Sequence, residues 1–515
     1  MTTSIIDLAR QAADRYAEHR AIVFGDRTLD FKTFEALSDK VAAGLAAQGI
    51  GKGDRIGLYC INSDFFALAY FGILKAGGTV VPINLLLNPK EVAYILQDAQ
   101  ARALIYFELF EEGVRSFRNQ LPDVTTYVRI GQSPPPDDAI NWTDLMQHPG
   151  AIPSVTFDPE EDVAAILYTS GTTGQPKGAM LTHHNLVSNV NSIREALHLT
   201  PGEDILLVVL PMFHAFAATV GMLFPLLNGC TIVPLPKFDP GQVAEAIAAH
   251  QVTVFMAVPS MYNVMLRLPD DVAPRLASLK VCVSGAAALP VEVMNRFEEK
   301  FGKPIYEGDG PTECGPVTCV NPIGGLRKPG SVGLCVPDVD MEIRDDDGRE
   351  LPRGEIGEIC VKGPNVMKGY WRRPEDTQAA FFGEWFRTGD LGYEDEDGYF
   401  FIVDRKKDMI IVNGMNVYPR VIEEVLYRFE PVREVAVVGE PNKAHGEIPV
   451  AYVSLKEEAT ATADDIRAYC REHLGRHEVP RKVLLVPDLP KNAAGKIMKR
   501  ELRKSGEHER GVREE

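Results

Sequence analysis

Residues 168–178 read Tyr-Thr-Ser-Gly-Thr-Thr-Gly-Gln-Pro-Lys-Gly, directly after the apolar run Val163–Leu167. This pattern predicts a buried strand followed by a loop that offers hydroxyl groups, glycines and a single lysine. Glycines let backbone N–H groups approach an anion, hydroxyls donate to phosphate oxygens, and lysine supplies a mobile positive charge. The spacing differs from that of a Walker A loop, which needs four residues between its glycine and the Gly-Lys pair. The loop therefore indicates polyphosphate binding of another kind.

The ordered string at 168–178 resembles the signature loop of the adenylate-forming superfamily, which includes acyl-CoA synthetases, peptide-synthetase adenylation domains and luciferases. Segments at 305–316, 384–419 and 489–497 extend this resemblance across nearly the whole chain. The resemblance implies that ATP, Mg²⁺ and coenzyme A take part in the reaction. It also implies phosphate contacts from Thr169, Ser170, Gly171, Thr172, Thr173, Gly174 and Lys177.

Strand and helix patterns alternate through the first two thirds of the 515 residues. One set comprises a strand over Arg55–Asn62, a helix over Ser63–Lys75 and a strand over Thr79–Pro82. A second set includes a helix over Gly221–Leu227. Such alternation predicts parallel sheets covered by helices. The chain is also too long for one ordinary core, which indicates several structural units.

The pattern changes at about residue 332, where short strands separated by glycine turns predict a small β-rich subdomain. A charged segment at 404–407 separates it from a region that resumes helix and strand. We therefore predict an α/β fold with a large N-terminal domain of parallel α/β sheets over 1–403, whose β-rich part covers about 332–403. A small mobile α+β domain over 408–515 follows, and the resemblance implies that it acts as a lid.

The composition narrows the functional classes. A net charge of −18 disfavours nucleic-acid binding, which depends on neutralising phosphates with Lys and Arg. Eight cysteines without a Cys-x-x-Cys pair predict a reduced, cytoplasmic protein that lacks a zinc site. The N-terminus shows no signal-peptide pattern, and the longest apolar stretch, Phe65–Leu74, ends at Lys75, so we expect no transmembrane segment. Peripheral membrane contact and a homodimer both stay open.

Residues 305–316 read Ile-Tyr-Glu-Gly-Asp-Gly-Pro-Thr-Glu-Cys-Gly-Pro, an apolar strand followed by a tight glycine turn. By resemblance, Thr312 contacts the nucleotide α-phosphate and Glu313 is the magnesium ligand, a role that suits a carboxylate oxygen. The family usually has an aromatic residue, commonly tyrosine, where this chain has Asp309, and that residue stacks on adenine. We expect the Asp309 side chain to turn outward to solvent. Further nucleotide contacts implied by the resemblance are Gly285, Ala286, Ala287, Glu307 and Gly308.

Residues 384–390 read Glu-Trp-Phe-Arg-Thr-Gly-Asp, and Asp390 resembles the residue that accepts hydrogen bonds from both ribose hydroxyls. Arg405 resembles the nucleotide-contacting arginine beside the ribose. Lys407 matches the hinge about which the C-terminal domain rotates, within the linker 404–407, and Gly414 matches the small residue that lines the pantetheine tunnel. We interpret the neighbouring Lys406 as solvated linker charge.

Two further residues are candidates for the chemical step. Lys496, in the string Pro490–Lys496, resembles the adenylation lysine that bridges the substrate carboxylate and the α-phosphate. His214 resembles the histidine that orients the incoming carboxylate and gates the acyl pocket. The other basic residues are interpreted as structural, with helix capping by His183 and His184 and surface charge at Lys491, Lys499 and Arg500.

The predicted activity is that of an AMP-forming acyl-CoA synthetase: a carboxylate and ATP form acyl-AMP, and the thiol of coenzyme A then displaces AMP. No Gly-x-Ser-x-Gly elbow is present, so catalysis would depend on positioning and electrostatics. Small residues in the apolar segment Phe216–Leu227, at positions expected to face a pocket, favour a medium- or long-chain fatty acid, with an aromatic acid as second choice. The alternatives are an acyl-AMP ligase that feeds a carrier protein and a degenerate acyl- or nucleotide-binding protein. The small residues are Ala217, Ala218, Thr219 and Gly221.

Overall fold

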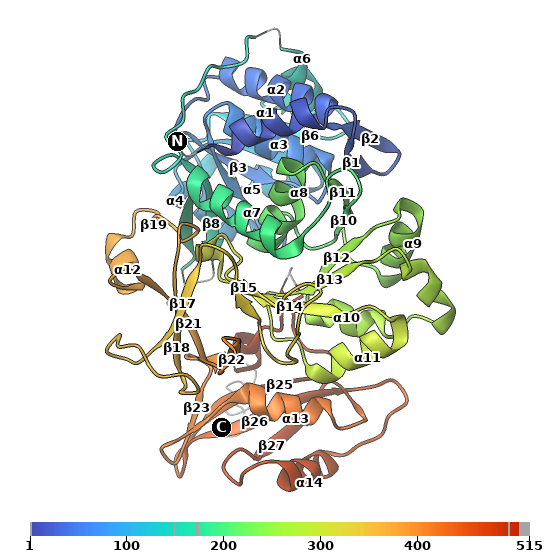
Figure 1. The fold of residues 1–515 in the computed structure, drawn as a ribbon. Coiled ribbons are helices and arrows are strands. Elements are labelled where there is room, and N and C mark those ends of the chain that lie inside the picture. Colours follow the sequence, from blue (N-terminus) through green and yellow to red (C-terminus); the bar gives the residue numbers. More distant parts are fainter. Residues whose placement is uncertain (1–2, 149, 170–174, 493–494, 504–515) are drawn as a thin grey trace.

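The computed structural model describes residues 3–148, 150–169, 175–492 and 495–503 (Figure 1). Two large sheets form the N-terminal domain, with helices between them and on their outer faces. Within the described residues, the first sheet has nine strands in the order β16-β15-β14-β13-β12-β10-β11-β1-β2. Their bounds are β1 Arg20–Phe24, β2 Arg27–Asp30, β10 Ile205–Val208, β11 Thr231–Pro234, β12 Val254–Ala257, β13 Val281–Ser284, β14 Ile305–Asp309, β15 Cys319–Val320 and β16 Leu334–Cys335.

The second large sheet has the strand order β19-β9-β8-β4-β3-β5-β6-β7. The inner strands of both sheets are parallel, as predicted, but their edges are antiparallel: β2 on one side, β15 and β16 on the other, and β9 and β19 in the second sheet. The strands of the second large sheet are β3 Arg55–Tyr59, β4 Thr79–Pro82, β5 Ala101–Phe107, β6 Thr126–Ile130, β7 Ile140–Asn141, β8 Val163–Thr169, β9 Lys177–Thr182 and β19 Gly369–Tyr370.

Helix α3 (Asp64–Lys75) is buried along almost its whole length, which explains why its sequence is a continuous apolar run. Ser63 caps its start by accepting from the Phe66 backbone N–H. The buried Lys75 at its end is paired with Glu35 and Asp39 of α2 (Phe31–Ala47), at 2.8 and 2.7 Å. The predicted strand–helix–strand set over 55–82 is therefore confirmed to within a few residues.

The predicted helix over Gly221–Leu227 takes a different form. A π-helix, η3 (Ala217–Leu223), comes first, and the short α8 (Phe224–Leu227) continues it. Every residue of η3 is buried. Gly221 faces the sheet, because a Cβ there would lie 3.3 Å from Val208 and 3.4 Å from Met256. A side chain larger than glycine at this position would press on those two residues.

The remaining helices of the N-terminal domain cover the two sheets. In Figure 1, α9 to α11 lie beside the strands β12 to β14. Their bounds are α1 Ile5–Arg15, α4 Pro89–Asp98, η1 Glu108–Phe110, α5 Glu111–Phe117, η2 Arg118–Gln120, α6 Trp142–Gln147, α7 His183–Leu197, α9 Pro240–His250, α10 Pro259–Met265, η4 Asp270–Leu276, α11 Val291–Phe301, η5 Thr312–Cys314 and α12 Pro374–Ala379.

A third, smaller sheet follows, as the glycine-turn pattern predicts, and its pairings are antiparallel. The last sheet carries two helices and forms the C-terminal domain at the bottom of Figure 1. The third sheet contains β17 Asp340–Arg344, β18 Gly357–Lys362, β20 Phe381–Phe382, β21 Trp385–Glu394 and β22 Phe400–Arg405. The C-terminal domain contains β23 Ile410–Val412, β24 Met415–Val417, α13 Pro419–Tyr427, β25 Val432–Asn442, β26 Gly446–Leu455, α14 Ala463–His473 and β27 Lys482–Leu485.

The segment that opens the C-terminal domain is a turn. Asp408 N–H donates to the Arg405 carbonyl at 2.9 Å, which places Lys406 and Lys407 at its two central positions. In the part of the chain that the structure describes, no helix is both long and apolar enough to cross a membrane.

Candidate active site

The signature segment begins on one strand and ends on the next. Thr169 ends β8, Lys177 begins β9, and the two residues pair across an antiparallel hairpin. The predicted phosphate contacts Ser170, Gly171, Thr172, Thr173 and Gly174 lie outside the described residues. Lys177 thus belongs to a strand, and its Nζ lies 2.5 Å from an oxygen of Asp376 on α12.

The predicted glycine turn follows β14 in a tightly folded form. A Cβ at Gly310 would lie 1.6 Å from the Pro316 carbonyl oxygen, so only glycine fits there. Thr312 and Glu313 begin η5 directly afterwards. An oxygen of Glu313 accepts a hydrogen bond from the Tyr370 hydroxyl at 2.8 Å.

Glu313 suits the magnesium ion that the resemblance implies. Among the described residues, no three or more His, Cys, Asp and Glu side chains gather into a metal-binding group. A magnesium ion that bridges two phosphates typically takes only one or two protein carboxylates, so a single half-buried glutamate is a sufficient donor set.

Two loops converge on the end of β14. A Cβ at Gly285 would lie 3.3 Å from the Gly308 carbonyl oxygen and 3.2 Å from the ring of Phe216. The next residue, Ala286, has a φ of +66°, a left-handed conformation that is strained for alanine and often marks a functional site. Ala287 continues this loop, which therefore presents its backbone beside β14.

Glu307 has a supporting position. Its buried carboxylate accepts from the Leu289 backbone N–H at 2.8 Å and so holds the loop that follows β13. Burial raises the pKa of Glu307 to about 7. Its side chain fixes the shape of the site and does not provide an open charge.

Asp390 and Arg405 form an ion pair between neighbouring strands. They are paired in register between β21 and β22, and Arg405 Nε lies 2.8 Å from Asp390 Oδ1. Arg405 has a raised pKa because Asp390 attracts its charge. The Asp390 side chain is 15 % exposed, and its carboxylate has further acceptor positions for hydroxyl groups.

Lys496 of the C-terminal domain lies near the Asp390–Arg405 ion pair. Burial and the nearby Arg405 lower the pKa of Lys496, while Asp390 and Asp309 act in the opposite direction. Its backbone is held in a small loop, in which Lys496 N–H donates to Asn492 Oδ1 at 2.9 Å. Lysine, arginine and two carboxylates therefore form one charged cluster where the two domains meet.

His214 faces this cluster as a neutral base. Burial, with the charge of Lys496, lowers the pKa of His214 to about 4. The Phe216 backbone N–H lies 3.4 Å from Nδ1, which favours the tautomer with hydrogen on Nε2. His214 can therefore donate one hydrogen bond without carrying a charge at neutral pH.

Asp309 belongs to the same cluster. Its side chain is half-buried, and burial together with Asp390 raises its pKa to about 6, against the opposing effect of Lys496. The expectation that Asp309 turns outward to solvent is therefore wrong. The strand pairing of β14 with β15 explains this, because it fixes the backbone at Asp309 opposite Cys319.

Gly414 forms, with Asn413, the two-residue turn between β23 and β24, and both residues have positive φ. A Cβ at Gly414 would meet nothing within 4 Å. Lys407 is exposed in the turn before β23, and its charge adds to that of Arg405 in lowering the pKa of Lys496.

Four basic residues differ from their predicted roles. Lys406 is paired with Asp346 and Glu358, at 2.5 and 3.1 Å, so its charge forms ion pairs and is not simply solvated in the linker. Lys491 is paired with Glu434 and Lys499 with Glu423, each at 2.8 Å. Helix α7 is capped by Thr182, while His183 is buried and accepts from the Ile5 backbone N–H. Each of these partners is distant in sequence or set by tertiary packing, which explains why local patterns did not reveal them.

Sequence reasoning also missed Tyr370 and Asp376. These residues contact Glu313 and Lys177, from which they are separated by 57 and 199 positions. Local spacing contains no signal for pairs so distant. Phe216, beside Gly285, was recognised only as part of an apolar segment.

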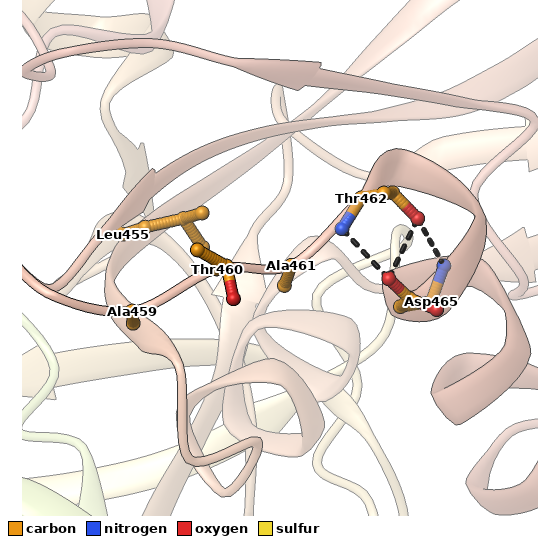
Figure 2. Close-up of a pocket in the computed structure, with 6 residues that line it drawn as sticks. All are labelled: Leu455, Ala459, Thr460, Ala461, Thr462 and Asp465. Atoms are coloured by element: carbon orange, nitrogen blue, oxygen red, sulfur yellow. Dashed lines mark hydrogen bonds between the residues drawn. The ribbon is translucent and has the colours of Figure 1, made fainter.

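A depression elsewhere on the molecule is explained by helix capping. Figure 2 shows Thr462 and Asp465 beside it, at the start of α14, with reciprocal hydrogen bonds of 2.8, 2.7 and 3.2 Å. Thr462 and Asp465 hydrogen-bond to one another and so have a structural role in capping the helix. We therefore take the charged cluster between the domains, and not this depression, as the candidate active site.

Two family models match the chain: residues 9–371 match the AMP-binding enzyme, and residues 421–496 match the AMP-binding enzyme C-terminal domain. The chain belongs to the AMP-binding enzyme family. Among its relatives, the long-chain-fatty-acid–CoA ligase of Bacillus subtilis (strain 168) is 37 % identical to this AMP-binding enzyme over 526 residues. That alignment covers 95 % of this chain and 92 % of the relative.

Solved structures agree with the fold of this AMP-binding enzyme. The anthranilate CoA ligase AuaEII, in complex with anthranoyl-AMP, is 30 % identical with a TM-score of 0.91, and the match covers 98 % of this chain and 97 % of that one. ATP-bound MatB from Rhodopseudomonas palustris is 33 % identical with a TM-score of 0.89, over 98 % and 99 % of the two chains.

Proposed function

We propose that this AMP-binding enzyme is an AMP-forming acyl-CoA synthetase, which couples a carboxylic acid to coenzyme A through acyl-AMP. One observation supports this above the others. Lys496, from the C-terminal domain, lies in one charged cluster with Asp390, Arg405 and Asp309, beside the neutral His214. A site of this kind suits the transfer of the adenylyl group of ATP from pyrophosphate to a carboxylate. Its cations and one neutral hydrogen-bond donor are already in place before the anions bind.

The first half-reaction needs a carboxylate to approach the α-phosphate of ATP, although both carry negative charge. Lys496 would lie between them and offset the charge that develops at phosphorus. His214 would orient the carboxylate through its Nε2–H, and Thr312 would donate to an α-phosphate oxygen. Since both anions favour a protonated lysine, their arrival would counteract the lowered pKa of Lys496.

The nucleotide would be held by groups on both large sheets and the third sheet. Asp390 would accept from the ribose hydroxyls with Arg405 beside it, and the backbone of 285–287 and 307–309 would border the base. Thr169 and Lys177 would contact the outer phosphates, together with the loop between them. Glu313 would hold Mg²⁺, whose chemistry is to bridge and neutralise phosphate oxygens.

We propose a medium- or long-chain fatty acid as the substrate. The buried small residues Ala217, Ala218 and Thr219 of η3 follow directly after His214 and Phe216, so the acyl chain would extend along an apolar wall. The similarity to the long-chain-fatty-acid–CoA ligase of Bacillus subtilis supports the same choice. An aromatic acid is the second candidate, favoured by the similarity to the anthranilate CoA ligase.

The second half-reaction would use another arrangement of the domains. We propose that the C-terminal domain over 408–515 turns about Lys407 and brings the exposed turn at Gly414 toward the site, where it would border the pantetheine arm of coenzyme A. A small α+β unit with its own core is suited to move as one body.

Free thiols at all eight cysteines support a cytoplasmic location.

Substrate and acceptor can be tested in one experiment. Fatty acids of increasing chain length, benzoate and cinnamate would each be assayed for pyrophosphate release from ATP, with and without coenzyme A. We expect the fastest release with a fatty acid and continued turnover only with coenzyme A. Release that stops after one equivalent despite coenzyme A would favour a carrier-protein acceptor, and no release with any acid would contradict the proposed activity.

Lys496→Ala tests the proposed division of the two steps. We expect loss of pyrophosphate release by at least a hundredfold, since one removed charge stabiliser typically costs this much. Thioester formation from supplied acyl-AMP and coenzyme A should largely survive. Lys443→Ala, at an exposed lysine of the same domain, is the control and should change neither rate. Equal loss of both half-reactions would contradict the assignment of Lys496 to adenylation.

A further inference from the structure

Tyr370 lies between the two groups proposed to meet the outer phosphates. Its hydroxyl donates to Glu313 at 2.8 Å, and Lys177 Nζ lies 5.5 Å from the centre of its ring. The other side of the Lys177 ammonium meets a carboxylate oxygen of Asp376, at 2.5 Å. Four side chains thus form a continuous chain: carboxylate, ammonium, aromatic ring with hydroxyl, and carboxylate.

Four contacts of the backbone hold this arrangement. Tyr370 pairs with Ala179 of β9, two residues after Lys177, and the Trp371 N–H donates to the Gly178 carbonyl at 2.7 Å. Tyr370 N–H donates to Thr377 Oγ1 at 2.9 Å, which docks α12 against the strand. Met367 N–H donates to the Glu313 carbonyl at 2.7 Å. The segment 367–379 is therefore fastened to both phosphate-facing elements.

The charges make this contact competitive with a polyphosphate. Lys177 and Asp376 side chains are 17 % and 36 % exposed, so solvent screens their attraction only in part. A nucleotide polyphosphate carries several negative charges, and it can take the ammonium from a single carboxylate. The ordinary pKa of tyrosine, about 10, already keeps the Tyr370 hydroxyl protonated at neutral pH, and its hydrogen bond to Glu313 identifies it as the donor.

We propose that Asp376 and Tyr370 are positioning residues of the polyphosphate site: Asp376 holds the Lys177 ammonium when no phosphate is bound, and Tyr370 contacts Lys177 with its ring and Glu313 with its hydroxyl. This rests on the proposed function, in which Lys177 and Glu313 face the outer phosphates. On this view Asp376 competes with ATP and with pyrophosphate for the same cation. It weakens the binding of both and helps the product to leave.

Asp376→Asn tests the competition, since the amide keeps the shape of the side chain and removes its charge. Binding of magnesium pyrophosphate to the full-length protein would be measured by calorimetry. We expect the Kd to fall at least threefold, together with a similar fall in the inhibition constant of pyrophosphate as a product. Glu375→Gln is the matched control, because it removes one exposed carboxylate from the same helix and should leave the Kd within a factor of 1.5.

The Lys177→Met background separates competition from a general change in charge. There, Asp376→Asn should no longer tighten pyrophosphate binding, because the cation under competition is absent. Tyr370→Phe keeps the ring and removes the hydroxyl, so we expect the magnesium concentration for half-maximal pyrophosphate binding to rise at least threefold. In a Glu313→Gln background the same change should have no further effect.

Three outcomes would contradict the proposals, and they can be told apart. Unchanged or weaker pyrophosphate binding in a folded Asp376→Asn variant, with an unaltered Tm, would overturn the role of Asp376 and leave the synthetase activity untouched. Tightening that persists in the Lys177→Met background would do the same. A wild-type protein that binds no magnesium pyrophosphate would instead contradict the proposed function itself.

Discussion

Asp309 is the residue at which this chain departs from the signature of its family. A carboxylate there adds negative charge close to a polyanionic substrate, and it provides no ring for adenine. Its environment is nevertheless ordered: Lys496 and Arg405 offset its charge, while burial and Asp390 raise its pKa to about 6. The side chain therefore has a defined place in the site between the two domains.

Substitution of Asp309 separates the effect of its charge from that of a missing ring. Asp309→Asn should lower the ATP KM by removing repulsion. Asp309→Tyr should lower it about fivefold further, because an aromatic contact is worth about 1 kcal/mol. Steady-state kinetics with ATP and GTP would measure both. A tenfold rise in the ATP KM of either variant, with improved use of GTP, would show instead that Asp309 recognises the edge of adenine.

Single residues also show where sequence reasoning works and where it stops. Lys496, His214, Asp390 and Arg405 stand in ordered strings, and the structure places them near one another. The partners of Lys177 and Glu313 could not be predicted, because no local pattern links positions 177 and 376. Spacing reveals groups that act within one loop. It does not reveal contacts that exist only after folding.

At the scale of elements, the strand–helix–strand set over 55–82 was predictable to within a few residues, because Ser63 caps α3 and two glycines precede β4. The direction of β9 was not, since the same alternation suits either orientation. The π-helical form of η3 could not be predicted from the sequence either. The wider turns of η3 occur where it contacts α7 and β10 of the first sheet, and such tertiary contacts are not contained in the sequence pattern.

Helix α1 offers a test of stability at this scale. It is joined to α7 by the hydrogen bond from Ile5 N–H to His183 Nδ1, at 3.3 Å, which requires an unprotonated ring nitrogen. Burial lowers the pKa of His183 from 6.5 to about 4. The folded chain then binds fewer protons than the unfolded one, so this stability is complete above pH 6.5 and is lost as the pH falls toward 4.

We expect the His183→Asn variant to show a smaller fall in its free energy of unfolding between pH 7 and pH 4 than the wild type. The difference should approach roughly 3 kcal/mol, from the size of the pKa change. Denaturant titrations at several pH values would measure it. His148→Gln, at an exposed histidine, is the control. Parallel pH profiles for the wild type and His183→Asn would show that protonation of His183 does not affect stability.

At the scale of the whole molecule, side-chain hydrogen bonds join the C-terminal domain to the N-terminal domain. One face of α10 contributes two of them: Ser260 Oγ donates to the Gly495 carbonyl at 2.9 Å, and Asn263 Nδ2 donates to the Arg433 carbonyl at 3.0 Å. The first of these holds the residue next to Lys496. Both belong to the arrangement in which Lys496 reaches the charged cluster.

The double variant Ser260→Ala/Asn263→Ala should destabilise this arrangement selectively. With about 1 kcal/mol for each hydrogen bond, we expect pyrophosphate release to slow by at least fivefold. Thioester formation from supplied acyl-AMP should be unchanged or faster, because it would use the other arrangement. Ser278→Ala removes a comparable hydrogen bond within the N-terminal domain and serves as the control. Equal slowing of both half-reactions would argue against separate arrangements.

The hairpin of β8 and β9 restricts how this sequence can change over generations. Lys177 is carried by a strand, where neighbouring side chains point to opposite faces. One residue inserted or deleted between Lys177 and Ala179 would therefore turn the lysine away from Tyr370, whereas an exchange of residue type would keep its direction. Insertions and deletions should therefore be absent from residues 177–179 among descendants of the gene, even where substitutions accumulate.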